Sequence, residues 1–203
     1  MNQYKLNPEF WKGKTVALVG GTGSMGYSMA KELLENTELA NLRIISRDEY
    51  KQWRMREDFE QIDKDKKIHF ILGDMRLYHE MYKSLRNCDI VFSVGANKDV
   101  RTCEENPDAA FETNVLGNQN IAKACDNLGI DSMIMVSTDK ATDPTTYYGK
   151  TKAMAEGNVI KANLTKPAKS KSKFAVTRCG NLWASRRSVI EKFDRMYQQN
   201  KNS

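Results

Sequence analysis

The amino-acid sequence predicts an α/β fold, a doubly wound parallel sheet of the Rossmann type, on three observations. Apolar runs of strand length alternate with amphipathic segments of helix length, which is the pattern of a parallel sheet covered on both faces. Six such runs follow one another within the 203 residues. A glycine-rich turn, Gly21-x-Gly23-x-x-Gly26, joins the first run to the first helical segment.

Each expected strand is a run of four or five mainly apolar residues with a turn, a cap signal or a polar segment after it. In order from the N-terminus, the strands are expected at Thr15–Val19, Leu42–Ser46, Ile68–Leu72, Ile90–Val94, Met133–Val136 and Phe174–Thr177.

The helical segments carry apolar residues at helical spacing. In the first of them, Met25, Met29 and Leu33 share the face that would cover the sheet, and Asp48 is a suitable N-cap for the second. The segment 165–172, rich in Lys, Ser and Pro, is expected to be a polar surface loop. Helices are expected over residues 24–36, 48–59, 77–86, 107–128, 146–163 and 188–198.

Composition indicates one globular domain with a core, because 40% of the residues are hydrophobic and 29% are charged. No apolar run has the length of a membrane span, and residues 1–14 contain no apolar leader, so a cytoplasmic protein without a membrane partner is expected. The four cysteines and two histidines have no metal-ligand spacing, so the thiols are expected to be reduced and no metal site is expected.

The net charge of +6 is unevenly distributed. Residues 161–203 hold eleven Lys or Arg residues against Glu191 and Asp194, a balance of +9. A basic lobe for nucleic acid is one interpretation, but no nucleic-acid motif is present. We therefore interpret these cations as a solvated loop with a few contacts to nucleotide phosphates, and no nucleic-acid partner is expected.

The glycine turn predicts a dinucleotide site, because it follows a strand and opens a helix. Glycines at this position let backbone N–H groups approach a pyrophosphate. The second strand ends in Ser46-Arg47, and Arg47 in place of an acid favours NADP over NAD, since a guanidinium pairs with a 2′-phosphate. The alternative for Arg47 is a solvated surface cation. Asp74 follows the third strand and is expected to meet the adenine, with a helix cap as its alternative role.

The reacting end is predicted by Thr138, Asp139 and Lys140 after the fifth strand, and by Tyr148 and Lys152 one helical turn apart. An ammonium near a phenol is expected to lower the pKa of Tyr148, so that it takes a proton near neutral pH. Asp139 and Lys140 add an acid and an amine to this site, which indicates elimination chemistry. The alternative is that these two residues form only a surface ion pair.

With these motifs the sequence resembles the NAD(P)-dependent UDP-N-acetylglucosamine 4,6-dehydratases, in the polysaccharide-biosynthesis branch of the extended short-chain dehydrogenase/reductase superfamily. The resemblance covers nearly the whole chain. The segments that carry it are Gly20-Gly21-Thr22-Gly23-Ser24, Ser46-Arg47-Asp48-Glu49, Gly73-Asp74-Met75-Arg76, Glu105-Asn106-Pro107, Thr113-Asn114-Val115-Leu116-Gly117, Ser137-Thr138-Asp139-Lys140-Ala141, Tyr148-Gly149-Lys150-Thr151-Lys152, Gly180-Asn181 and Ser185-Arg186.

The resemblance implies a transient oxidation at the sugar C4, loss of water across C5–C6, and return of the hydride. Tyr148, assisted by Thr138 and Lys152, would take the C4 hydroxyl proton. Lys140 would remove the C5 proton and Asp139 would protonate the leaving hydroxyl. In having tyrosine at position 148, the chain resembles the family's enzymes that invert C5, since the membrane-bound retaining relatives have methionine there.

The resemblance also implies binding residues. Substrate, a nucleotide sugar such as UDP-N-acetylglucosamine, would be bound by Lys98, Asn181 and Arg186. The cofactor, NADP or alternatively NAD, would be bound by Gly20, Thr22, Gly23, Ser24, Met25, Gly26, Ser46, Arg47, Asp74, Met75, Ala96, Lys98, Asn114, Tyr148 and Lys152.

The chain departs from the family pattern at Asp99, where histidine is usual, at Arg187, where glycine is usual, and at Glu191, where proline is usual. Residues 1–181 are expected to form the NAD(P)-binding domain, and 182–203 the start of a substrate-binding lobe that is largely absent. A self-associated chain or a partner that supplies this lobe is expected. Two alternatives stay open: an NAD(P)-binding module without turnover of its own, and a related nucleotide-sugar epimerase or reductase.

Overall fold

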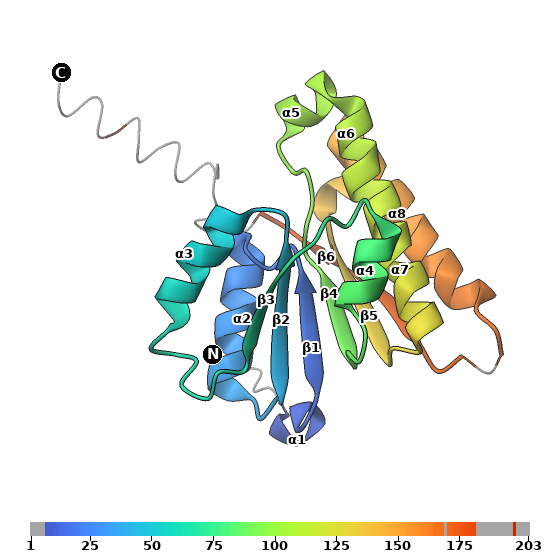
Figure 1. Ribbon diagram of the computed structural model, residues 1–203. Helices are drawn as coiled ribbons and strands as arrows, with labels where there is room; N and C mark the ends of the chain where they lie inside the picture. Colours follow the sequence, from blue (N-terminus) through green and yellow to red (C-terminus); the bar gives the residue numbers. More distant parts are fainter. Residues whose placement is uncertain (1–6, 169, 182–196, 198–203) are drawn as a thin grey trace.

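A computed structural model of the chain describes residues 7–168, 170–181 and 197, and six strands of these residues form one parallel sheet (Figure 1). The sheet order is β3-β2-β1-β4-β5-β6, and every neighbouring pair is parallel. The six predicted strands are confirmed. Their bounds are β1 Thr15–Val19, β2 Asn41–Ser46, β3 Ile68–Leu72, β4 Ile90–Ser93, β5 Ser132–Thr138 and β6 Lys173–Cys179.

Helices connect the strands and cover both faces of the sheet (Figure 1). They are α1 Pro8–Trp11, α2 Ser24–Asn36, α3 Glu49–Phe59, α4 Tyr78–Ser84, α5 Val100–Glu105, α6 Pro107–Phe111, the π-helix η1 Glu112–Leu116, α7 Gly117–Leu128, the 3-10 turn η2 Asp139–Ala141 and α8 Tyr147–Thr165. The expected last helix over 188–198 lies outside the described residues, apart from Tyr197.

The helices differ from the sequence expectation in three places. The single helix expected over 107–128 is divided into α6, η1 and α7 by the π-helical segment. Helix α5 was not predicted, because its six residues are too few to show a period; Asp99 caps it by accepting a hydrogen bond from the Thr102 N–H at 2.8 Å. The four-residue helix α1 was likewise too short to predict. The expected cap of α3 is confirmed, since Asp48 accepts from the Lys51 N–H at 3.0 Å.

Two apolar layers form the core, one on each face of the sheet. Along β1, Val16 and Leu18 point into the layer under α1, α2 and α3, while Ala17 and Val19 point into the layer under α4, α7 and α8. All four of these side chains are buried. This alternation explains why β1 is apolar on both faces, as a central parallel strand must be.

The order of the strands reverses at β1, which pairs with β2 on one side and with β4 on the other. In open α/β sheets ligands bind at such a reversal, outside the carboxyl ends of the strands. Two glycines meet there: Gly20 after β1 has φ +85°, and a Cβ on it would lie 2.3 Å from the Cα of Gly95 after β4. Glycine is therefore required where the crevice opens.

Two features are absent from the residues that the structure describes. These residues contain no helix long and apolar enough to cross a membrane. They also contain no group of three or more His, Cys, Asp or Glu residues placed to hold a metal ion.

Candidate active site at the carboxyl edge of the sheet

The glycine turn after β1 is a tight backbone loop. The N–H of Gly21 donates to the Leu18 oxygen at 3.2 Å, and the N–H of Gly23 donates to the Gly20 oxygen at 3.0 Å. A Cβ on Gly26 would lie 2.5 Å from the Cα of Gly21, so the first turn of α2 packs directly on this loop.

Helix α2 begins at Ser24 with Gly23 as its N-cap and no side-chain cap. Gly23 is exposed, and Thr22, Ser24 and Met25 beside it are half-buried. A helix N-terminus that has no side-chain cap and follows a glycine turn presents backbone N–H groups that can bind a phosphate. The residues predicted for the pyrophosphate therefore lie together and fit the group.

On the adenosine side, Arg47 and Asp74 lie together at the ends of β2 and β3. The Asp74 carboxylate accepts from the backbone N–H of Arg76 at 3.0 Å and from its guanidinium at 2.6–3.1 Å, and Arg47 Nη1 lies 3.7 Å away. Burial opposes ionisation of Asp74, but these bonds outweigh it, and the pKa of the carboxyl is lowered. Asp74 does not cap α4, whose N-cap is Leu77 without a side-chain bond.

Two other residues predicted to bind cofactor face inward. The side chain of Met75 is buried in the core and packs against Gly95 and Gly117. Ser46 is also buried, and Gln52 Nε2 donates to its oxygens at 3.1 Å. Both side chains therefore belong to the packed interior.

The segment 95–98 after β4 is fixed by Asn114, which is fully buried in η1. The Asn114 Oδ1 accepts from the Asn97 N–H at 2.9 Å, and its Nδ2 donates to the Asn97 oxygen at 3.0 Å and to Thr151 Oγ1 on α8 at 3.0 Å. Ala96 is half-buried and Lys98 is exposed. Sequence reasoning missed Asn97 and Thr151, because hydrogen bonds across 17 and 37 residues leave no local pattern.

The reacting end gathers around Thr138, the last residue of β5. Its hydroxyl donates to Asp139 Oδ1 at 2.9 Å, and the Lys140 Nζ lies 3.1 Å from the same oxygen. Hydrogen bonds from Thr138 and Lys140 lower the pKa of Asp139. Lys140 Nζ also donates to Asn181 Oδ1 at 3.1 Å, which brings a predicted substrate-binding residue to this turn. Arg186, the other such residue beyond β6, lies outside the described residues.

Tyr148 and Lys152 both face the carboxyl end of β5, but their titration differs from the sequence prediction. The pKa of Tyr148 is raised, mainly by burial, although a hydrogen bond with Thr138 acts against the rise. Lys152 is 2% exposed and donates to the Val136 oxygen at 2.8 Å. Burial lowers its pKa to about 8, with Glu156 acting in the opposite direction. The prediction of a lowered Tyr148 pKa is wrong for this structure, because burial of the phenol outweighs its hydrogen bond with Thr138, and the Lys152 amine bonds to Val136 instead.

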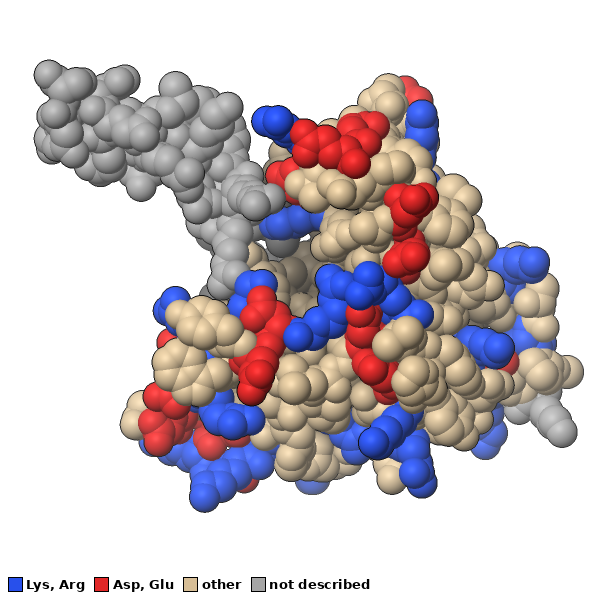
Figure 2. All heavy atoms as spheres, turned by 45° about the horizontal axis from the view of Figure 1, so that its top comes forward, with Lys and Arg blue, Asp and Glu red and all other residues tan. Residues whose placement is uncertain are grey.

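Hollows in the surface lie at both ends of the sheet. Figure 2 looks obliquely onto the carboxyl edge and shows it hollowed, with Lys and Arg side chains along the border. A cavity of about 250 Å³ beside Asp74 is lined by Arg76, Leu77, Glu112 and Leu116.

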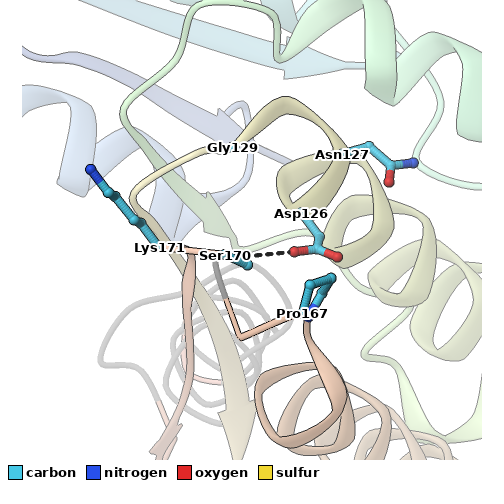
Figure 3. A pocket seen from close by; sticks show the side chains of 6 residues that line it. All are labelled: Asp126, Asn127, Gly129, Pro167, Ser170 and Lys171. Carbon is cyan, nitrogen blue, oxygen red and sulfur yellow. Dashed lines mark hydrogen bonds between the residues drawn. The ribbon is translucent and has the colours of Figure 1, made fainter.

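Another cavity, of about 410 Å³, lies at the opposite end, where α7 leads into β5 (Figure 3). Asp126 and Lys171 line it, and Ser170 Oγ donates to Asp126 Oδ1 at 2.9 Å. No motif residue contributes to it.

A protein-family model described as "Polysaccharide biosynthesis protein" matches residues 16–202. A UDP-glucose 4-epimerase of Rickettsia bellii (strain OSU 85-389) is 38% identical over 192 residues, which are 93% of this chain and 55% of that protein. A UDP-N-acetylglucosamine 4,6-dehydratase (inverting) of Campylobacter jejuni is 36% identical over 189 residues, with the same coverage. The chain thus spans about half the length of the curated relatives it matches.

Solved structures agree on the fold. Pen from Bacillus thuringiensis has a TM-score of 0.89 and 37% identity, over 94% of this chain and 59% of that one. A dTDP-glucose 4,6-dehydratase from Streptomyces venezuelae, solved with NAD, has a TM-score of 0.78 over 91% of this chain and 62% of that one. At 19% identity the second likeness concerns the fold alone.

Proposed function

The chain belongs to the polysaccharide biosynthesis protein family, and on this premise we propose that it carries the cofactor and proton-transfer half of a nucleotide-sugar 4,6-dehydratase. One observation supports this most. A phenol, a hydroxyl, a carboxylate and an amine (Tyr148, Thr138, Asp139 and Lys140) meet at the carboxyl end of β5, beside the buried Lys152. Hydride transfer alone needs only the phenol and the buried amine, whereas loss of water also needs a base and an acid.

The proposed cofactor is NADP, with NAD as the alternative. It would be held by the glycine turn and the start of α2, by Arg47 and Asp74 on the adenosine side, and by Tyr148 and Lys152 at the reacting end. When bound, it supplies the acceptor and donor of a hydride. We assign residues 1–181 to this cofactor domain and 182–203 to the start of a substrate-binding lobe.

The proton path that we propose follows the observed hydrogen bonds. Since burial keeps the Tyr148 phenol protonated at neutral pH, it accepts the proton of the sugar C4 hydroxyl while passing its own to Thr138. Thr138 passes a proton to Asp139, to which it already donates at 2.9 Å. Asp139 gives that proton to the departing C6 hydroxyl, and Lys140, as the neutral amine, removes the proton from C5. Once C6 has received the hydride taken from C4, and C5 a proton on its opposite face, the products are water and a 4-keto-6-deoxy sugar with inverted C5.

Asn181 and Lys98 complete the proposal on the substrate side. Asn181 Oδ1 accepts from Lys140 at 3.1 Å, so a sugar hydroxyl entering here would meet both groups. A UDP-sugar such as UDP-N-acetylglucosamine is the proposed substrate, with Arg186 as a further ligand.

The second candidate is a 4-epimerase, because the Rickettsia bellii relative carries that name at 38% identity. Epimerisation returns the hydride to C4, so its product has the same mass as the substrate. Dehydration gives a product lighter by one water. Mass therefore separates the two activities.

The test supplies UDP-N-acetylglucosamine and NADP to the chain, alone and fused to the C-terminal part of the Campylobacter jejuni relative. Loss of one water is expected from the fusion. Asp139→Asn and Lys140→Met should each slow it at least about a hundredfold, while Lys150→Met, an exposed lysine on the same helix as Tyr148, should not. A product of unchanged mass would establish the epimerase, and cofactor binding without any product would establish the binding module.

The cofactor choice has a separate test by binding titration. Arg47→Ala should weaken NADP binding about tenfold or more and leave NAD binding unchanged, since only NADP offers a 2′-phosphate to the guanidinium. Arg54→Ala, an exposed arginine on α3, is the matched control. Tighter binding of NAD than of NADP by the unaltered chain would contradict the role of Arg47.

A further inference from the structure

Arg178 on β6 contacts two elements of the proposed site at once. The register of β5 and β6 places it beside Ser137, one residue before Thr138. Its Nε lies 3.0 and 3.2 Å from the two oxygens of Glu156, and its Nη2 donates to Glu156 Oε2 at 2.6 Å. Its remaining Nη1 donates to Thr142 Oγ1 at 3.1 Å.

Glu156 belongs to the helix that carries the proposed proton-transfer groups. It lies one turn after Lys152 on α8, and its side chain is 7% exposed. Burial opposes its ionisation, but the bonds from Arg178 outweigh this and lower the pKa of the carboxyl. A buried carboxylate of this kind needs a fixed partner, and Arg178 supplies it.

Thr142 belongs to the other element, the turn η2 with Asp139 and Lys140. It is the C-cap of η2, and its N–H donates to the Asp139 oxygen at 3.0 Å. The same turn packs on α8, where a Cβ on Gly149 would lie 2.5 Å from the Lys140 oxygen. The turn and the helix are thus in close backbone contact, and Arg178 bonds to both.

We propose that Arg178 is a positioning residue that holds the Asp139–Lys140 turn at a fixed distance from Tyr148 and Lys152, through Thr142 on one side and Glu156 on the other. The inference rests on the proposed function. A guanidinium is suited to this task, because its planar fork serves a carboxylate and a hydroxyl in fixed directions, which a lysine ammonium cannot do. The side chains of Asp139 and Lys140 are about half exposed, so their positions depend on how the turn η2 is held.

The first arm of the test observes the turn without substrate or cofactor. The chain is labelled with ¹³C at the lysine Cε atoms, and the Lys140 signal is assigned with Lys140→Arg. Thr142→Val, which spares the Arg178–Glu156 pair, and Arg178→Lys, which keeps the charge, should each shift that signal. Arg101→Met breaks an exposed Arg–Glu pair on α5, at 2.7 Å, and should leave the signal in place.

The second arm measures turnover in the fusion. Both variants should lower kcat by about tenfold or more while KM changes less than about twofold, because the acid and the base would be displaced from the reacting atoms. A Lys140 signal that is unchanged in both variants would overturn the positioning role of Arg178, whatever the kinetics show. If the fusion makes no product at all, the proposed dehydratase function fails. The shift of the Lys140 signal then decides by itself whether Arg178 positions the turn.

Discussion

Lys152 is a buried amine that donates to the Val136 carbonyl, with Glu156 one turn further along α8. Burial disfavours its charged form, so its pKa falls from 10.5 to about 8. In the unfolded chain the amine stays protonated up to its ordinary pKa. Between these two values the unfolded state binds more protons than the folded state, and stability must rise with pH.

This sign predicts a pH-dependent difference between the wild type and Lys152→Met. The free energy of unfolding of the wild type, relative to the variant, should rise by on the order of 3 kcal/mol between pH 8 and 10.5. Urea denaturation of both proteins across this range measures it. Groups other than Lys152 titrate in both proteins and cancel. A difference that is flat with pH would show that Lys152 keeps its ordinary pKa and stays charged in the folded protein over this range.

At the scale of elements, the π-helix η1 decides how the crevice is built. A π-helical turn adds a residue to the helical repeat, and such turns often mark functional sites. Here it carries Asn114, whose amide joins the segment 95–98 to Thr151 on α8. A second link between elements caps α8, where Glu104 of α5 accepts from the Tyr147 N–H at 2.7 Å.

Asn114→Ala should therefore destabilise the protein by about 2–3 kcal/mol, because it leaves the partly buried N–H of Asn97 without its partner and the oxygen of Asn97 with only the weak donor Cys103 Sγ. Asn120→Ala is the matched control. The Asn120 amide donates to the oxygens of Met75 and Arg76 nearer the surface, so we expect a loss below about 1 kcal/mol. Urea denaturation compares the two, and equal losses would contradict the special role of Asn114.

At the scale of the whole molecule, the two ends of the sheet differ. The carboxyl edge collects the glycine turn, Arg47, the segment 95–98 and the turn after Thr138 on either side of the strand reversal. The opposite edge holds the cavity lined by Asp126 and Ser170, away from these motifs (Figure 3). The proposed function requires that a nucleotide bind only at the first of these edges.

Hydrogen exchange with and without NADP tests that requirement. Protection is expected in the amides of residues 20–26, 46–48 and 95–98, because a bound dinucleotide would cover the carboxyl edge. The amides of residues 126–129 should exchange at an unchanged rate and serve as the internal control. Protection confined to 126–129 would place the nucleotide in the other cavity and refute the proposed site.

The sequence by itself determined the six strands, the glycine turn and the placement of Tyr148 and Lys152 one turn apart on one helix. These features are local: apolar periodicity reports which face is buried, and a spacing of four residues places two side chains on one face of a helix. For the same reason Thr138, Asp139 and Lys140 could be placed at the carboxyl edge as soon as the fifth strand was recognised.

Only the tertiary structure decided how these groups are partnered and charged. Arg178 meets Glu156 across 22 residues and Asn114 meets Thr151 across 37, and neither pair leaves a periodic trace in the sequence. Lys152 was expected to lower the pKa of Tyr148, but its ammonium is held by Val136, and burial raises that pKa instead. The physical reason is that spacing fixes which side chains share a face, whereas desolvation and hydrogen-bond partners depend on everything packed around them.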